Sequence, residues 1–148
     1  MGMLAAGVNG IKLAKDDYVI AAERITAGSE IGLLADDGRG LRFSVDEIPV
    51  QGRYGQGVIA TRLKKGVELA GMLLGKGSQV GIVHFHSSAS RTMRLDEISQ
   101  LKRSVVGKEV LPVKPGDEVY FVTPILDNLA IWKQKEELPR RRGKAKGE

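Results

Sequence analysis

Short apolar runs alternate with turn sequences along most of the chain, and the runs have the length of strands rather than helices. Three clear runs are rich in Val, Ile, Leu and Ala: residues 18–22, 30–35 and 58–63. The turn sequences carry Gly, Asp, Lys and Pro, and they lie at 36–38, 64–66 and 114–117. The best candidate for a helical period is 126–138, which stops before Pro139. The pattern therefore predicts an all-β protein, with one helical turn after Ser44 where Glu47 follows at the capping-box spacing.

One constant offset of about fifty residues relates the parts of the chain to each other. It places Gly7 on Gly57 and on Gly107, and it places Asp-Glu-Ile at 46–48 on Asp-Glu-Ile at 96–98. Apolar positions agree under the same offset, and no insertion is needed. A four-stranded unit of about fifty residues is typical of a propeller blade, so we predict a β-propeller-like pinwheel.

The repeat register divides the chain into about three blades' worth of sequence. Residues 5–22 match the second half of a unit, and 128–133 match the start of one, with two whole units between them. We therefore expect a repeat domain over 1–132 and a separate tail over 133–148. Two arrangements complete the blades: a six-bladed ring of two chains, in which a homodimer closes the partial blades, or a longer repeat domain of which this is a piece.

Composition and charge restrict the environment and the partners. The chain has no cysteine and no apolar run near the roughly 18 residues that span a bilayer, which predicts a cytoplasmic protein without membrane contact. The net charge is +5. Seven basic and three acidic residues in 133–148 give +4, which leaves +1 for the rest. We expect this tail to be disordered, either as a solvated terminus or as a tether attracted to phosphates.

The sequence from Leu33 to Leu63 resembles a blade of the C-terminal β-pinwheel of gyrase A or topoisomerase IV A subunits. It reads Leu-Leu-Ala-Asp-Asp-Gly-Arg-Gly-Leu-Arg-Phe at 33–43, then Asp-Glu-Ile, then Gln-Gly-Arg-Tyr-Gly-Gln-Gly at 51–57. The resemblance extends over about 5–132. It implies a non-catalytic module that binds duplex DNA on a basic outer rim and bends it, beside the core subunits of a type IIA topoisomerase, which is ATP-dependent. The cleavage tyrosine of that family lies outside this segment.

The most specific motif of that family is a box, Gln-Arg-Arg-Gly-Gly-Arg/Lys-Gly. At 51–57 this chain keeps Gln51, Arg53, Gly55 and Gly57, and two of its three departures remove positive charge. The counterpart at 101–107 keeps only Arg and Gly. The resemblance thus implies bending or binding of DNA rather than strong wrapping.

Physically, the box suits a phosphate-binding loop, because glycines let the backbone approach a phosphate and a fixed arginine adds a charged contact. The alternative is a tight turn between blades whose glycines serve geometry alone. Further cations extend the surface, and we name the predicted set the basic rim: Arg53, Arg62, Lys64, Lys65, Lys102, Arg103 and Lys108. With Gln51, Gly55 and Gly57 they form the predicted nucleic-acid-binding residues.

Other motifs do not predict a cofactor, a metal or a catalytic site. His84-Phe85-His86 places two imidazoles on one strand face, but no third ligand is evident. Gly71–Ser78 is one residue too short for a phosphate-binding P-loop. The favoured function is therefore a DNA-binding accessory module. The alternative is a protein-interaction propeller whose DNA affinity comes only from the tail, because the body is nearly neutral.

Overall fold

The fifty-residue offset reappears in the computed structural model as a repeated set of strands. The structure describes residues 6–125, so the tail at 133–148 and the partial unit at 128–133 lie outside the described residues, as does 126–138. The elements are β1 (Glu30–Ala35), β2 (Arg39–Ser44), η1 (Val45–Glu47), β3 (Leu69–Gly75), β4 (Val80–Phe85), β5 (Arg91–Arg94), η2 (Leu95–Glu97), β6 (Lys108–Glu109) and β7 (Val119–Pro124). Strands β1 and β4, η1 and η2, and the starts of β3 and β7 each lie fifty residues apart.

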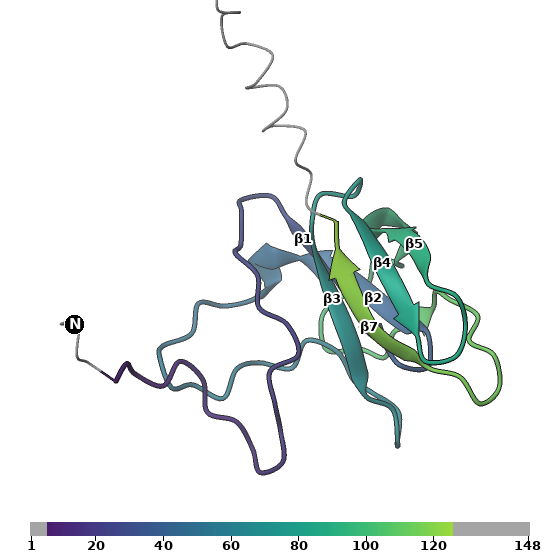
Figure 1. Cartoon of the computed structure of the whole chain (residues 1–148). Coiled ribbons are helices and arrows are strands. Elements are labelled where there is room, and N and C mark those ends of the chain that lie inside the picture. Colours follow the sequence, from purple (N-terminus) through teal and green to yellow (C-terminus); the bar gives the residue numbers. More distant parts are fainter. Residues whose placement is uncertain (1–5, 126–148) are drawn as a thin grey trace, which may run out of the picture.

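These strands form two antiparallel sheets that pack face to face (Figure 1). The first sheet has the order β3-β1-β2-β6, and the second has the order β5-β4-β7. The central strand β1 of the first sheet pairs with β2 and with β3, which begins about forty residues after β1. In the same way, β4 of the second sheet pairs with β5 and with β7, which begins about forty residues after β4. The four-stranded first sheet confirms the predicted all-β fold and the blade-like unit.

The first sheet takes its fourth strand from the following unit. Strand β6 pairs with β2 through Arg39 opposite Glu109 and Gly40 opposite Lys108. The backbone N–H groups of Val110 and Leu111 both donate to the carbonyl of Gly38, at 3.0 and 3.1 Å. The two units are thus joined by main-chain hydrogen bonds as well as by side-chain packing.

Strand alternation puts apolar side chains on both faces of the first sheet. Ile31 and Leu33 pack with Phe43 on one face, while Leu34 points to the other. On that second face Leu34 and Leu73 meet Val83, Met93 and Val119 of the second sheet, all of them fully or nearly fully buried. A Cβ on Gly81 would lie 2.4 Å from Leu73, so this glycine permits the close approach of the sheets. The main core therefore lies between the two units.

The predicted helical turn after Ser44 is a 3-10 turn. The Ser44 hydroxyl accepts a hydrogen bond from the Asp46 N–H at 3.2 Å, so Ser44 caps η1. The Glu47 carboxylate does not complete the capping box. It accepts a hydrogen bond from the N–H of Arg103, at 3.1 Å, and thereby contacts the next unit.

Two predicted strands differ from the structure. Residues 18–22 form no strand, and 58–63 contributes only a bridge between Arg62 and Val106. Both segments are apolar enough for strands, but a strand needs a neighbour to satisfy its backbone groups. Within residues 6–125 neither segment pairs with a neighbouring strand along its length. Their apolar side chains are accordingly exposed.

Candidate nucleic-acid interface

Lys64 and Lys65 lie in a tight turn that the chain forms three times. The N–H groups of Asp17, Val67 and Asp117 donate to the carbonyls of Ala14, Lys64 and Lys114, at 3.3, 3.1 and 3.0 Å. Each turn has one residue with positive φ. The three turns lie at the same end of the molecule, along the lower border of Figure 1. This end also carries Lys15 and Lys114, two exposed lysines that the sequence-based prediction missed although the repeat register places them in the same turn.

The box loop at 51–57 is held by the N-terminal segment. The N–H of Tyr54 donates to the Gly10 carbonyl and the N–H of Lys12 donates to the Gly55 carbonyl, both at 2.9 Å. Tyr54 has a φ of 62°, so the loop turns sharply there. Arg53 is exposed, and its side chain makes no hydrogen bond or ion pair with the described residues. The amide of exposed Gln51 donates to the Pro49 carbonyl at 3.4 Å, and Gly57 has a φ of 77°.

The next loop, 101–107, repeats the same backbone path. The N–H of Ser104 donates to the Ala60 carbonyl and the N–H of Arg62 donates to the Val105 carbonyl, each 2.9 Å long and each fifty residues from its counterpart. Exposed Lys102 and half-buried Arg103 precede this bridge, and exposed Lys108 follows it in β6. The loop therefore lies against the segment that leads to Lys64 and Lys65, and six of the seven rim cations belong to two adjacent stretches of chain.

Arg103 is held more firmly than the other rim cations. Its Nε donates to the Glu47 carbonyl at 3.2 Å and its Nη1 donates to the Ile59 carbonyl at 2.7 Å. Neutral carbonyls accept both hydrogen bonds, so the guanidinium keeps its positive charge in a fixed position. An arginine held this way loses little side-chain entropy when it contacts a phosphate.

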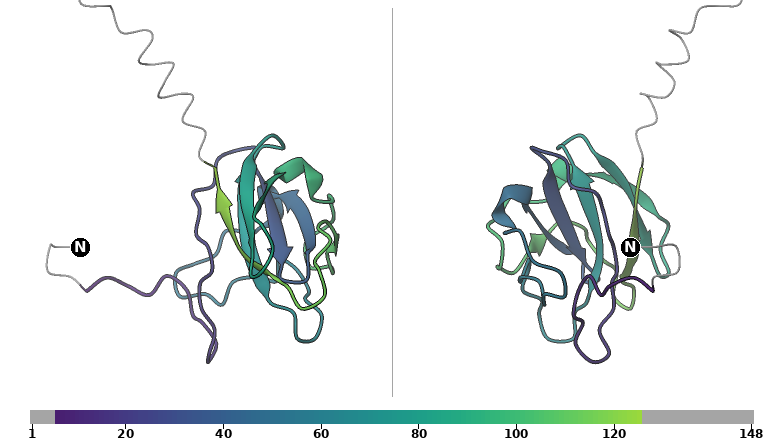
Figure 2. Two further views of the ribbon diagram at one scale, coloured as in Figure 1. Left: turned by 45° about the vertical axis from the view of Figure 1, so that its right-hand side comes forward. Right: turned by 90° about the vertical axis from the view of Figure 1, so that its left-hand side faces the viewer.

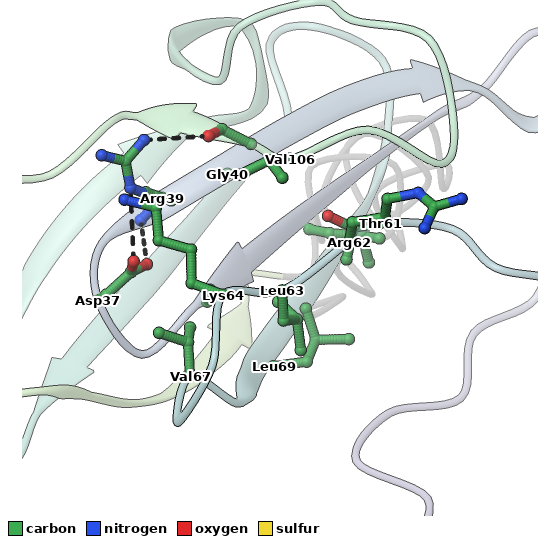
Figure 3. A pocket seen from close by; sticks show the side chains of 13 residues that line it. Asp37, Arg39, Gly40, Thr61, Arg62, Leu63, Lys64, Val67, Leu69 and Val106 are labelled. Carbon is green, nitrogen blue, oxygen red and sulfur yellow. Dashed lines mark hydrogen bonds and ion pairs between the residues drawn. The ribbon is translucent and has the colours of Figure 1, made fainter.

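Arg62 borders a small hollow between the first sheet and the segment 61–69. Its Nε donates to the Ser104 carbonyl at 3.1 Å, and the guanidinium points away from the hollow, as Figure 3 shows. On the other side, Arg39 forms an ion pair with Asp37 at 3.4 Å. The cavity volume is about 10 Å³, which is room for about one water molecule. The hollow is therefore too small for an organic ligand, and the Arg62 guanidinium lies outside it.

Ion pairing distinguishes the rim from four arginines elsewhere in the chain. Arg39, Arg42, Arg91 and Arg94 each pair with a carboxylate. Within residues 6–125, no ion pair involves a side chain of the basic rim. An unpaired cation at the surface attracts phosphate more strongly than one whose charge is compensated. The predicted rim is therefore free of ion pairs within the described residues, a property that it shares with Lys12, Lys15, Arg24, Lys76 and Lys114.

In the second unit one carboxylate, that of Asp117, links two turns, and we name this contact the Asp117 staple. The sequence pattern did not indicate it. The Asp117 carboxylate accepts hydrogen bonds from the N–H groups of Ser87 at 2.8 Å, Ser88 at 3.0 Å and Glu118 at 2.9 Å. A hydrogen bond from the Ser88 side chain, more than these amides, lowers the pKa of Asp117 from 3.8 to about 2, although desolvation opposes the shift. The turn between β4 and β5 is therefore tied to the turn before β7.

This pKa predicts a loss of local order in acid. Because the folded-state pKa of Asp117 is below its unfolded value, the carboxylate stabilises the fold above about pH 4 and loses this effect as the pH falls toward 2. We expect amide exchange at 87–88 to accelerate across that window, after correction for the intrinsic pH dependence of exchange. The Asp117→Asn variant should exchange faster at neutral pH and show little further acceleration. An unchanged profile in the variant would contradict the staple.

The two histidines do not form a metal site in the described part of the chain. The ring of His84 lies between the hydroxyls of Ser90 and Thr123, at 3.0 and 3.1 Å, and stacks on Phe121. His86 contacts Tyr120 edge to face. Within 6–125 no group of three or more His, Asp, Glu or Cys side chains could hold a metal ion. Over the same residues no helix is long and apolar enough to cross a membrane.

Comparisons with known proteins agree with the repeat and the sheets. The family model of the DNA gyrase C-terminal domain, a β-propeller, matches residues 4–26 and 33–76. The DNA gyrase A protein of Aminobacterium colombiense is 32% identical over 126 residues, which cover 80% of this chain and 15% of the relative. That of Pseudomonas aeruginosa is 31% identical over 121 residues, which cover 80% of this chain and 13% of the relative. A solved C-terminal domain of DNA topoisomerase IV superposes with a TM-score of 0.70 at 23% identity, covering 80% of this chain and 38% of that one.

Two packed antiparallel sheets built from a fifty-residue repeat define a domain of the β-propeller class. Within that class, the chain is homologous to the C-terminal domain of DNA gyrase A proteins. This confirms the resemblance seen in the sequence and the expectation of an accessory, non-catalytic domain. The chain spans about 15% of the length of the relatives it matches.

Proposed function

We propose that this chain is a non-catalytic module that binds and bends duplex DNA on its basic rim, as part of the gyrase A-type chain of a type IIA topoisomerase. The observation that supports the proposal is the placement of six of the seven rim cations on two stretches of chain joined by backbone hydrogen bonds, with none of them in an ion pair within residues 6–125. Unpaired cations on repeated loops contact phosphates without reading bases, which gives affinity with little sequence preference. The proposal requires the cytoplasm, where bacterial DNA lies.

A pair of charge-matched variants tests the rim. The first combines Lys64→Gln, Lys65→Gln and Lys102→Gln, all at exposed positions. The control combines Lys76→Gln, Arg91→Gln and Arg94→Gln, which removes the same charge from other exposed positions. We expect the rim variant to bind a duplex at least about tenfold more weakly than the control in gel shifts. Equal affinities would contradict a rim and indicate a response to net charge alone.

Bending is measured separately on a duplex of about 40 base pairs with a fluorophore at each end. Contacts on loops that follow one another around the domain pull DNA toward the protein, and the bend is repaid by those contacts. We expect energy transfer between the two fluorophores to rise on binding. If the duplex binds and energy transfer between the fluorophores does not rise, the module binds DNA without bending it.

A protein-interaction propeller is the second candidate, and the near-neutral body favours it. The charge of +4 in 133–148 would then supply all DNA affinity. Deleting these residues discriminates between the two functions, because the rim predicts retained binding and the alternative predicts none. The proposed partners beyond DNA are the topoisomerase core subunits and a second copy of this chain. A monomer in size-exclusion chromatography at micromolar concentration would exclude the second copy.

A further inference from the structure

One face of the second sheet points away from the first sheet and has its own set of side chains. Val83 of β4 is buried in the core between the sheets, so its neighbours Ile82 and His84 point to the opposite side. The residues of β5 and β7 that lie beside these two share that side. We name this surface the outer face: Ile82, His84, Ser90, Thr92, Phe121 and Thr123.

The outer face cannot receive another sheet as closely as the first sheet receives the second. Under the offset of fifty, Ile82 and Phe121 occupy the positions of Gly32 and Gly71. A Cβ at Gly32 would lie 2.5 Å from a leucine side chain of the second unit, and a Cβ at Gly71 would lie 2.7 Å from a valine side chain of β7. The two sheets therefore meet over glycines, whereas isoleucine and phenylalanine fill these positions on the outer face.

Polar groups also replace core residues on the outer face. Leu34 and Leu73 are each 1% exposed between the sheets, and their counterparts are His84 and Thr123. The His84 ring lies between the hydroxyls of Thr123 and Ser90, at 3.1 and 3.0 Å, so these polar groups satisfy one another within the sheet. The outer face is thus built differently from the surface on which the two units pack.

Aromatic rings leave apolar area at this surface. The rings of His84 and Phe121 stack with centroids 4.2 Å apart, and Tyr120 contacts Phe121 edge to face at 5.2 Å. Phe121 is 43% exposed, and Ile125, just beyond the end of the same strand, is 41% exposed. Clustered apolar area of this kind is typical of a surface that another segment covers.

The chain itself supplies an apolar segment next to the outer face. The described residues end one position beyond β7, at the upper end of that strand in both views of Figure 2. Residues 126–132 follow and read Leu-Asp-Asn-Leu-Ala-Ile-Trp, with the only tryptophan of the chain and a single charged side chain. They do not fit the repeat as a core strand, because Lys133 would take the position of Val83, which is 0% exposed.

This segment is long enough to reach the exposed rings. Phe121 lies four residues before Ile125, about 13 Å along β7. Trp132 lies seven residues after Ile125, and a chain of that length spans about 10 Å as a helix and about 23 Å when extended. A chain that reverses direction after β7 therefore brings the indole to the outer face in either conformation.

We propose that residues 126–132 fold back over the outer face, with Trp132 against the rings of His84 and Phe121. Contacts between aromatic rings add to the free energy gained by burying their apolar area. The segment covers a surface that does not suit another unit of the repeat. It also anchors the basic tail at 133–148 beside β4 and β7, so that its charge of +4 stays close to the domain.

The fluorescence of Trp132 in the full chain tests this contact, because no other tryptophan contributes. We expect acrylamide to quench it at least about threefold more weakly than in a free peptide of residues 126–138, since a covered indole is shielded from solvent. Phe121→Ser should raise quenching toward the value of the peptide. Tyr54→Ser is the matched control, because it removes another exposed ring from the box loop, and quenching should stay at the parent value.

A second measurement leaves the rings in place. The chain has no cysteine, so a bimane fluorophore can be attached at Thr92→Cys, an exposed position of the outer face. Tryptophan quenches bimane on contact, and we expect the emission of this probe to rise when Trp132→Phe is added. The same probe at Gln51→Cys, an exposed position of the box loop, should not respond to Trp132→Phe.

Each other outcome overturns the proposal. Quenching equal to that of the free peptide would show that the segment leaves the outer face uncovered. Parent-like shielding in Phe121→Ser, with no response of the probe at Thr92→Cys, would place Trp132 elsewhere. Shielding that disappears on dilution from about 50 to about 1 μM would identify a second copy of the chain as the source of the contact. None of these measurements involves DNA, so their failure leaves the proposed function standing.

Discussion

Raising the salt concentration from about 50 to about 200 mM is expected to weaken duplex binding about a thousandfold. Each phosphate contact releases condensed counterions, and the logarithm of the binding constant then falls with the logarithm of salt by about 0.9 per contact. About six contacts from the basic rim give a slope near −5, and a fourfold change in salt then lowers affinity by about three orders of magnitude. Gel shifts or anisotropy over a salt series measure this slope directly.

The slope also distinguishes the rim from the tail. The variant with Lys64→Gln, Lys65→Gln and Lys102→Gln should flatten the slope by about 2–3, whereas the control with Lys76→Gln, Arg91→Gln and Arg94→Gln should leave it nearly unchanged. Arg91 and Arg94 pair with Glu97 and Asp96, so their charge is already compensated within the protein and they are not expected to neutralise phosphates. Affinity that does not change across the salt range would remove phosphate contacts as the basis of binding.

Gly38→Ala is expected to destabilise the domain by about 3 kcal/mol, the largest effect we expect from a single methyl group. Gly38 has a φ of 80°, and a side chain in this left-handed region costs roughly 1–2 kcal/mol. The added Cβ would also lie 2.2 Å from the carbonyl oxygen of Leu111, and forcing such a contact apart costs roughly 1–3 kcal/mol. Moving Leu111 away also weakens the two hydrogen bonds that the Gly38 carbonyl accepts.

Thermal unfolding measures this effect, and about 3 kcal/mol corresponds to a fall in Tm of about 10 °C for a domain of this size. Gly52→Ala is the matched control, because no atom lies within 4 Å of its Cβ position and its φ is outside the left-handed region. We expect that variant to unfold within about 2 °C of the parent chain. A Gly38→Ala chain as stable as the Gly52→Ala chain would show that 108–113 does not press on the turn as described.

Much of the fold is readable from the sequence because it repeats. The run at 30–35 coincides with β1, and the turns at 36–38, 64–66 and 114–117 lie where Gly, Asp and Pro place them. The offset of fifty shows which residues are equivalent. It does not show which strands pair, because equivalence carries no information about neighbours. The pairing of the short β6 with β2 of the preceding unit could therefore not be predicted from the sequence.

The exposure of the candidate rim residues could be predicted from the sequence, whereas their contacts could not. The exposed positions of Lys64, Lys65 and Lys102 follow from their places in polar turns and loops. The hydrogen bonds of Arg103 to main-chain carbonyls could not be foreseen, since they depend on how η1 of one unit meets the loop of the next. The Asp117 staple was hidden for the same reason, because its partners Ser87 and Ser88 lie about thirty residues away.

The origin of β6 in the following unit has a consequence for how the molecule comes apart. A repeat protein whose units close on themselves can lose them one at a time, each with its own midpoint. Here, peeling away 108–113 opens the edge of a sheet whose neighbouring strand lies about seventy positions earlier. Fraying at one end thus propagates inward, and the two sheets should melt as a single cooperative body.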